Sequence, residues 1–119
     1  PFDCSAMRPL APIMAEIDTA TRVELIELAN EREVAIEING GPGRDPAYRA
    51  ATSDFFNLAR EMGARFTVTA DAHHPDDFVR LDTALDWARD LGIDDARFLT
   101  PEELRARHRR KREVRRLAP

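Results

Sequence analysis

The sequence is poor in cysteine, in histidine and in long apolar runs, and each shortage excludes something. Its 119 residues include a single cysteine, Cys4, so no disulfide can form within the chain, and we expect a reducing, cytoplasmic location. No segment approaches the roughly 20 apolar residues of a membrane-spanning helix, and the first residues lack the pattern of a secretory signal. We therefore expect no membrane partner. A hydrophobic content of 43% is sufficient for one folded core.

Charge is divided unequally along the chain. Eight of the 18 Lys and Arg residues lie in residues 105–119, which contain one acid, Glu113. The acidic character of residues 1–104 argues against a broad nucleic-acid footprint. Residues 105–119 are expected to form a basic helical tail, which can contact nucleic-acid phosphates or an acidic protein surface. A solvated helix end that frays is the alternative interpretation.

Helices and strands are expected to alternate after an irregular, proline-rich segment at residues 1–15. Apolar periodicity and β-branched runs predict helices over 19–32, 47–63, 77–92 and 100–112, and strands over 33–38, 65–70 and 96–99. Local signals mark several helix ends: Thr19 or Thr21 as a first cap, Gly63 and Gly92 as C-terminal caps, and a capping box of Thr100 and Glu103. In the third helix we expect an apolar stripe of Phe78, Leu81, Leu85, Trp87, Ala88 and Leu91.

This alternation predicts an α/β fold of parallel strands joined by right-handed crossover helices. Two architectures are compatible with so few strands. One is a small doubly wound sheet, and the other is a slice of a larger barrel. The chain begins at Pro1 without a methionine, which fits the slice better.

Polar side chains gather where the first two expected strands end. Glu37 and Asn39 alternate to one side of the first strand, and Asp71 and His73 follow the second in "TADAHHP". On an extended chain, residues two apart point the same way, so Asp71 and His73 can reach one point. A carboxylate and a neutral imidazole are ligands that Zn²⁺, Mn²⁺ and Fe²⁺ accept. Alternatively, Asp71 caps the following helix and the histidines face solvent.

The order of these segments resembles a known family. The run "VAIEING", then "LAREMGARFTVTADAHHPDDF", then a helix and "GI" is similar to the C-terminal part of the PHP family, named for polymerase and histidinol phosphatase. The resemblance covers roughly residues 20–104. It implies a distorted (β/α)7 TIM-like barrel with two or three divalent ions of Zn, Mn or Fe. It also implies hydrolysis of a phosphate ester, such as histidinol phosphate or a nucleotide, by a metal-bound hydroxide.

The resemblance assigns roles residue by residue. Asp71 and His73 match metal ligands of the family's last motif. Glu37 and Asn39 match the "EIN" motif, whose residues support the site or the strand. His74 occupies a variable position that faces either substrate phosphate or solvent.

Arg44, in "GPGRDP", lies just beyond the first expected strand. It is a candidate for binding substrate phosphate, with an ordinary surface arginine as the alternative.

The chain departs from the family in one large respect. The family's early H-x-H motif is missing here, since the only histidines are His73, His74 and His108. We therefore interpret residues 1–104 as the C-terminal part of a PHP-like domain, with Pro1 directly after a lost ligand. The N-terminal half of the barrel is then a required partner, and the fragment is either inactive by itself or completed by another segment. Two alternatives remain: a PHP module of a DNA polymerase or repair protein that acts on nucleic-acid ends, and a non-catalytic structural or interaction domain.

Overall fold

The computed structural model describes residues 10–117, so the expectations about Pro1 and Cys4 concern residues outside this range. Its main elements are α1 (Leu10–Glu16), α2 (Thr19–Glu31), β1 (Ile36–Asn39), α3 (Pro46–Glu61), β2 (Phe66–Thr69), α4 (Arg80–Asp90) and α5 (Pro101–Leu117). Short 3₁₀ helices are η2 (Pro42–Arg44), η3 (Pro75–Val79) and η4 (Asp95–Arg97). None of the described helices is long and apolar enough to cross a bilayer.

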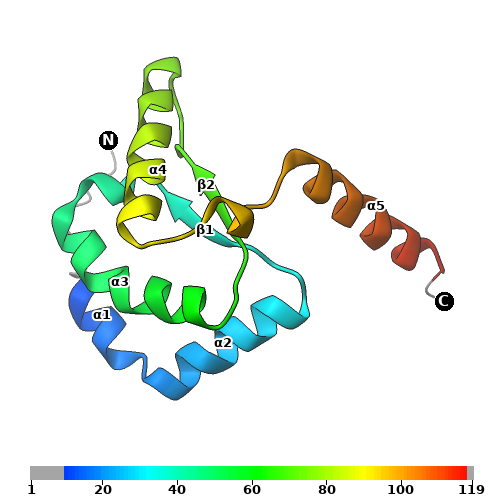
Figure 1. The fold of residues 1–119 in the computed structure, drawn as a ribbon, viewed down its shortest axis with the longest axis horizontal. Coiled ribbons are helices and arrows are strands. Elements are labelled where there is room, and N and C mark those ends of the chain that lie inside the picture. Colours follow the sequence, from blue (N-terminus) through cyan, green and yellow to red (C-terminus); the bar gives the residue numbers. More distant parts are fainter. Residues whose placement is uncertain (1–9, 118–119) are drawn as a thin grey trace.

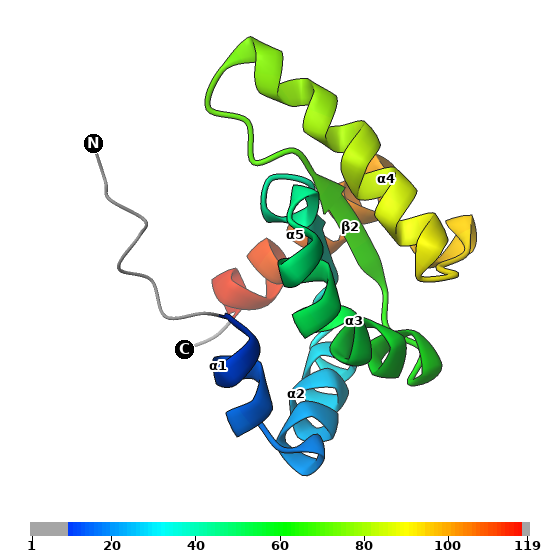
Figure 2. The same cartoon turned by 90° about the vertical axis from the view of Figure 1, so that its left-hand side faces the viewer.

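The two strands form a parallel sheet, with α3 as the crossover between them (Figure 1). Ile36 lies opposite Phe66 and Asn39 lies opposite Thr69. Figure 2 shows α4 running beside β2, and in Figure 1 α5 extends away from the other elements. The predicted α/β class with parallel strands is therefore confirmed.

Alternation along the strands gives the sheet one apolar and one polar face. Ile36, Ile38, Phe66 and Val68 belong to the core or pack against it. The opposite face carries Glu37, Asn39, Thr67 and Thr69, none of which is buried. The apolar face packs against α2, α3 and α4, whose buried members include Ile26, Phe56, Ala59, Ala84, Trp87 and Ala88. The polar face is therefore the side on which the candidate residues Glu37 and Asn39 lie.

The prediction of a third strand at 96–99 is wrong. Asp95–Arg97 form η4, and Phe98 makes only an isolated parallel bridge to Phe66 on the edge of β2 away from β1. The amides of Arg97 and Phe98 donate to the carbonyls of Asp94 and Asp95 in the 3₁₀ turn and so leave the extended pattern. The guanidinium of Arg65 also holds this segment, because it donates to the carbonyl of Arg97 at 3.1 Å and to that of Phe98 at 2.9 Å.

The first expected strand begins later than predicted. Glu33 has a φ of 53°, in the left-handed region, which interrupts the extended backbone. β1 starts at Ile36 and runs one residue beyond the predicted end, to Asn39. The shift brings Asn39 into the parallel ladder instead of the loop.

Helix ends agree with the sequence signals in part. Gly63 and Gly92 have φ values of 79° and 66°, as expected of residues that follow a helix end. The predicted first caps were wrong, because Asp18 precedes α2 and its carboxylate accepts from the Thr21 amide at 2.7 Å. This hydrogen bond lowers the pKa of Asp18. The expectation of irregular structure is also wrong for residues 10–15, since Leu10–Glu16 form α1, while residues 1–9 lie outside the described range.

The apolar stripe of the third predicted helix is only partly correct. Trp87, Ala88 and Leu91 are buried, whereas the Phe78 side chain is 66% exposed and Leu81 is also exposed. The first residues of that segment form η3 instead of α-helix. A 3₁₀ turn advances with a different angle per residue, so Phe78 leaves the face that a continuous α-helix would give it.

Candidate metal site at the strand ends

The loops that leave β1 and β2 meet at the carboxyl ends of the strands. The Gly40 amide donates to the Thr69 carbonyl at 2.8 Å, which extends the ladder by one residue. The Gly41 amide donates to Oδ1 of Asn39, also at 2.8 Å. A Cβ built on Gly41 would lie 3.2 Å from Asn39 Oδ1 and 3.6 Å from Asp71 Oδ2. The absence of a side chain at Gly41 therefore lets Asn39 and Asp71 share this corner.

Asp71 and His73 lie together, but not for the reason expected from the sequence. Asp71 has a φ of 49°, so the backbone turns there and the alternation of an extended chain does not apply. The turn nonetheless brings His73 Nε2 to 3.7 Å from Asp71 Oδ1. The side chains are 83% and 54% exposed, respectively. Convergence of the two groups thus arises from a left-handed residue rather than from strand geometry.

The pair has the chemistry of two metal ligands but does not form a complete set. Two atoms bound to one ion at about 2.1 Å with a tetrahedral angle lie about 3.4 Å apart, close to the separation observed here. Within residues 10–117, however, no group of three or more His, Cys, Asp or Glu side chains is arranged to hold a metal ion. Asp71 and His73 would hold such an ion only with further ligands from elsewhere.

Glu37 lies on the same polar face of β1, two residues before Asn39. Its carboxylate accepts a hydrogen bond from the Thr69 hydroxyl on the neighbouring strand. This contact ties β1 to β2 across the polar face, which agrees with a supporting position. The same carboxylate contributes, after burial, to raising the pKa of Tyr48.

His74 begins the 3₁₀ helix after the loop. Its Nδ1 accepts from the Asp76 amide at 3.3 Å and also lies 3.3 Å from Asp76 Oδ2. One nitrogen cannot accept and donate at once, so the first contact needs an Nδ1 without hydrogen and the second needs an Nδ1 that carries one. His74 therefore caps η3, and its side chain remains 70% exposed. Asp71 does not cap this helix.

Asp77 and Arg80 organise the loop, and the sequence reasoning missed both. Asp77 Oδ2 accepts from the His73 amide at 3.0 Å and from the His74 amide at 3.1 Å. The first of these hydrogen bonds is the main reason why the pKa of Asp77 is lowered. Arg80 binds Asp77 at 2.6 Å and donates to the carbonyl of Asp71 at 3.3 Å.

The signal for Asp77 was present in the sequence. An acidic residue three positions after a cap is the capping-box pattern, and here His74 takes the cap position that Ser or Thr usually holds. Asp77 and Arg80 thus fix the backbone that presents Asp71 and His73.

Arg44 does not join this cluster by any polar contact. It ends η2, its side chain is exposed, and it forms no hydrogen bond or ion pair through its guanidinium within the described part of the chain. Its role in binding phosphate stays a prediction. Comparisons with protein families, with curated proteins and with solved structures find no match for this chain.

Proposed function

We propose that this chain is the C-terminal part of a PHP-type barrel that hydrolyses a phosphate ester with divalent metal ions. The observation that carries the proposal is the 3.7 Å approach of Asp71 Oδ1 and His73 Nε2 at the carboxyl end of β2. In parallel α/β folds, this end of the sheet is where active sites are built. Asn39 and Gly41 reach the same corner from β1, so two adjacent strands contribute to it.

The cover of the sheet supports a barrel rather than a doubly wound sheet, which carries helices on both faces. β1, β2 and the Phe98 bridge lie side by side in chain order, as neighbouring strands of a barrel do. The core helices pack on the apolar face, and the other face is polar. In a barrel of the (β/α)7 kind, the polar face of Glu37 and Thr67 would line the interior.

The second edge of β1, which pairs with no strand among residues 10–117, supports a preceding strand. Amides of Ile36 and Gly40 donate to β2, so in a parallel ladder those of Glu37 and Asn39 point to the other edge. Beside this edge lies a hollow of about 360 Å³ whose wall is largely apolar. It is lined by Met14, Ile17, Arg22, Leu25, Ile36, Glu37, Tyr48, Thr52, Phe55 and Phe56. The N-terminal half of the barrel would cover both features and supply the remaining metal ligands.

The proposed chemistry belongs to the complete domain. When bound, two or three Zn, Mn or Fe ions would neutralise the phosphate oxygens and make water a better nucleophile near neutral pH. Asp71 and His73 would each give one ligand, while Asp77 and Arg80 hold their backbone in place. The substrate is a small phosphorylated metabolite, such as histidinol phosphate, or a nucleotide.

Metal content tests this proposal. The protein that includes the rest of the barrel should contain more than one transition-metal ion, measured by elemental analysis, and should hydrolyse histidinol phosphate or free nucleotides. Asp71→Asn and His73→Gln should each lower metal occupancy because each removes a ligand. Asp76→Asn and His108→Gln are matched controls, since both side chains are exposed and neither belongs to the pair.

Two results would decide against the enzyme. Unchanged metal occupancy in Asp71→Asn would place this loop outside the site. A protein that lacks metal and phosphatase activity would favour the non-catalytic domain. Activity on DNA 3′ ends in place of small phosphates would favour the DNA-synthesis or repair module, the second candidate, which the basic character of α5 supports.

A further inference from the structure

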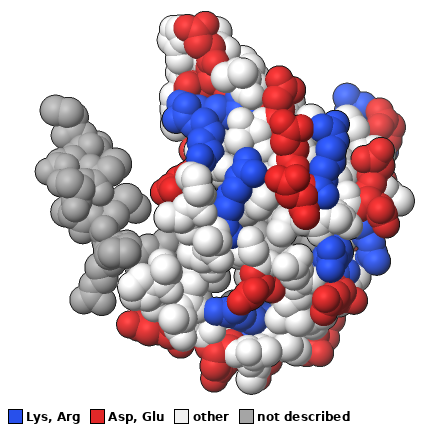
Figure 3. All heavy atoms as spheres, turned by 60° about the vertical axis from the view of Figure 1, so that its left-hand side comes forward, with Lys and Arg blue, Asp and Glu red and all other residues white. Residues whose placement is uncertain are grey.

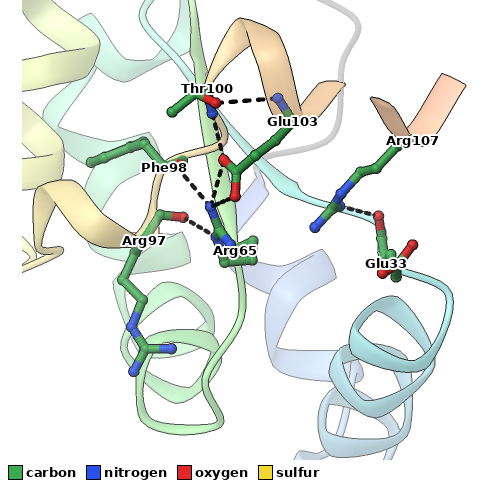
Figure 4. Close-up of polar contacts among 7 residues, drawn as sticks. All are labelled: Glu33, Arg65, Arg97, Phe98, Thr100, Glu103 and Arg107. Carbon is green, nitrogen blue, oxygen red and sulfur yellow. Dashed lines mark hydrogen bonds and ion pairs between the residues drawn. The ribbon is translucent and has the colours of Figure 1, made fainter. Parts of the chain in front are cut away.

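α5 is attached to the rest of the molecule through one side only. Glu103 binds Arg65 at 2.9 Å, and Arg107 donates to the carbonyl of Glu33 (Figure 4). Arg110 lies 3.3 Å from the Glu33 carboxylate. No residue of α5 is buried. The side that carries Glu103, Arg107 and Arg110 is therefore the docking side of the helix.

The opposite side of α5 carries a row of four arginines. At 3.6 residues per turn, Arg105, Arg109, Arg112 and Arg116 fall within about 60° of the helix circumference, roughly opposite the docking side. All four side chains are exposed. Of these four arginines, Arg105 alone forms an ion pair within residues 10–117, with Glu102 at 3.4 Å. We call these four residues the arginine row.

This arrangement is unfavourable for an isolated helix. Arg105 and Arg109, and likewise Arg112 and Arg116, are like charges four residues apart, which repel and destabilise a helix. A solvated helix face more often alternates charges of opposite sign. The face of the body drawn in Figure 3 shows such a mixture of acidic and basic side chains. An external anion would relieve the repulsion between these like charges.

We propose that the arginine row binds the phosphate backbone of a nucleic acid without reading its sequence. The row extends over about 16 Å at about 1.5 Å per residue, which matches roughly five phosphates of one strand at about 3.4 Å each. Arginine binds phosphate through two parallel hydrogen bonds, and the row contains no lysine. This interaction does not depend on the metal chemistry proposed above.

The composition of α5 favours a nucleic acid over a membrane or a protein. Residues 101–117 contain no aromatic side chain, and aromatic anchors dominate protein interfaces. The exposed apolar residues Leu104, Val114 and Leu117 lie off the arginine row and are spread around the helix. A helix that lies on a lipid surface needs a continuous apolar face, which α5 lacks. Contacts by charge alone suffice for non-specific binding to nucleic acid.

Salt dependence measures the number of phosphates bound. Fluorescence anisotropy with a labelled DNA duplex of random sequence should give a slope of about −3.6 for log K against log salt, at about 0.9 per phosphate. Affinity should then fall roughly 150-fold between about 50 and about 200 mM salt. Arg109→Gln with Arg112→Gln should halve the slope and weaken binding on the order of 100-fold at about 50 mM salt. Glutamine keeps the helix, which circular dichroism can verify.

Arg32→Gln with Arg89→Gln is the matched control, because it removes the same charge from exposed positions on the body. This control should leave the slope unchanged. Parallel titrations with single-stranded DNA and with RNA identify which nucleic acid is preferred. Equal weakening by the control pair, or a slope near zero, would overturn the proposal. So would equally tight binding to polyglutamate, or binding to anionic phosphatidylserine vesicles but to no nucleic acid.

Discussion

The body of the molecule, residues 10–99, and α5 are held by different forces. The body closes around a core in which Ile26, Ile38 and Phe66 are completely buried. α5 has no buried residue and is attached mainly by charged groups of Arg65 and Glu33. Apolar burial stabilises in proportion to area, whereas exposed ion pairs contribute little. α5 should therefore detach under conditions in which the body remains folded.

Removing Trp87 should have the largest effect on the body. Its ring meets that of Phe56 edge-on, with centroids 5.0 Å apart and an interplanar angle of 75°, and the residue is almost completely buried. Trp87→Ala should lower the free energy of unfolding by about 3–5 kcal/mol in urea titrations. Phe78→Ala is the control, because this exposed ring should cost less than about 0.5 kcal/mol. A large loss of unfolding free energy in Phe78→Ala would instead support the continuous apolar stripe that the sequence predicted.

A methyl group at Gly40 should have the next largest effect. A Cβ there would lie 1.8 Å from the carbonyl oxygen of Arg80, where the start of α4 crosses the end of β1. Gly40→Ala should lower the free energy of unfolding by about 3 kcal/mol, because two backbone segments must separate. Gly41→Ala is the matched control, since its nearest neighbour is a side-chain oxygen at 3.2 Å. Equal stability of the two variants would contradict the close approach of α4 and β1.

A smaller and local effect is expected at Arg65, which joins the body to α5. Arg65→Gln removes hydrogen bonds to Glu103 and to the carbonyls of Arg97 and Phe98. Hydrogen exchange should become roughly fivefold faster in α5, for a loss of about 1 kcal/mol in local stability. Exchange in α3 should not change. Arg89→Gln, which breaks an exposed ion pair with Asp86, should alter neither helix. Faster exchange throughout the body would show that α5 is part of its cooperative unit.

The same contrast explains which parts of the fold the sequence predicts. Four helices, two strands and the caps at Gly63, Gly92 and Thr100 were predicted correctly, because each depends on residues close in the chain. The strand at 96–99 is a 3₁₀ turn instead, and its carbonyls bind Arg65, more than thirty residues earlier. Periodicity within one segment cannot register such a contact. The phase error at Phe78 has a local cause, a 3₁₀ turn instead of an α-turn.

The candidate site was predictable in position but not in geometry. Parallel strands end at one edge, so the strand pattern alone places Asn39 and Asp71 near each other. The left-handed turn at Asp71 and the glycine that makes room for it at Gly41 could not be inferred from residue types. The boundary proposed between residues 104 and 105 falls inside α5, which is continuous from Pro101. The chain becomes basic near that boundary, but α5 begins at Pro101, directly after its cap Thr100.

The smallest expected effect is a shift in one titration at the start of α5. The Thr100 amide donates to the Glu103 carboxylate, and this bond, with Arg65 as the next cause, lowers the pKa of Glu103. Because the pKa is lower in the folded state, ionised Glu103 favours the attached helix above its unfolded pKa of about 4.3. That contribution is lost as the pH falls through the folded pKa. An NMR titration of the Thr100 amide should therefore show a midpoint below the ordinary value for glutamate.

Arg65→Gln should raise this midpoint only part of the way to the ordinary value, because the hydrogen bond from Thr100 remains and is the larger cause. Glu103→Gln should abolish the acid transition at Thr100, while its side chain can still complete the capping box. A midpoint in Arg65→Gln equal to that of an unperturbed glutamate would instead make Arg65 the dominant influence. The start of α5 would then be fixed by its contact with the body and not by its own cap.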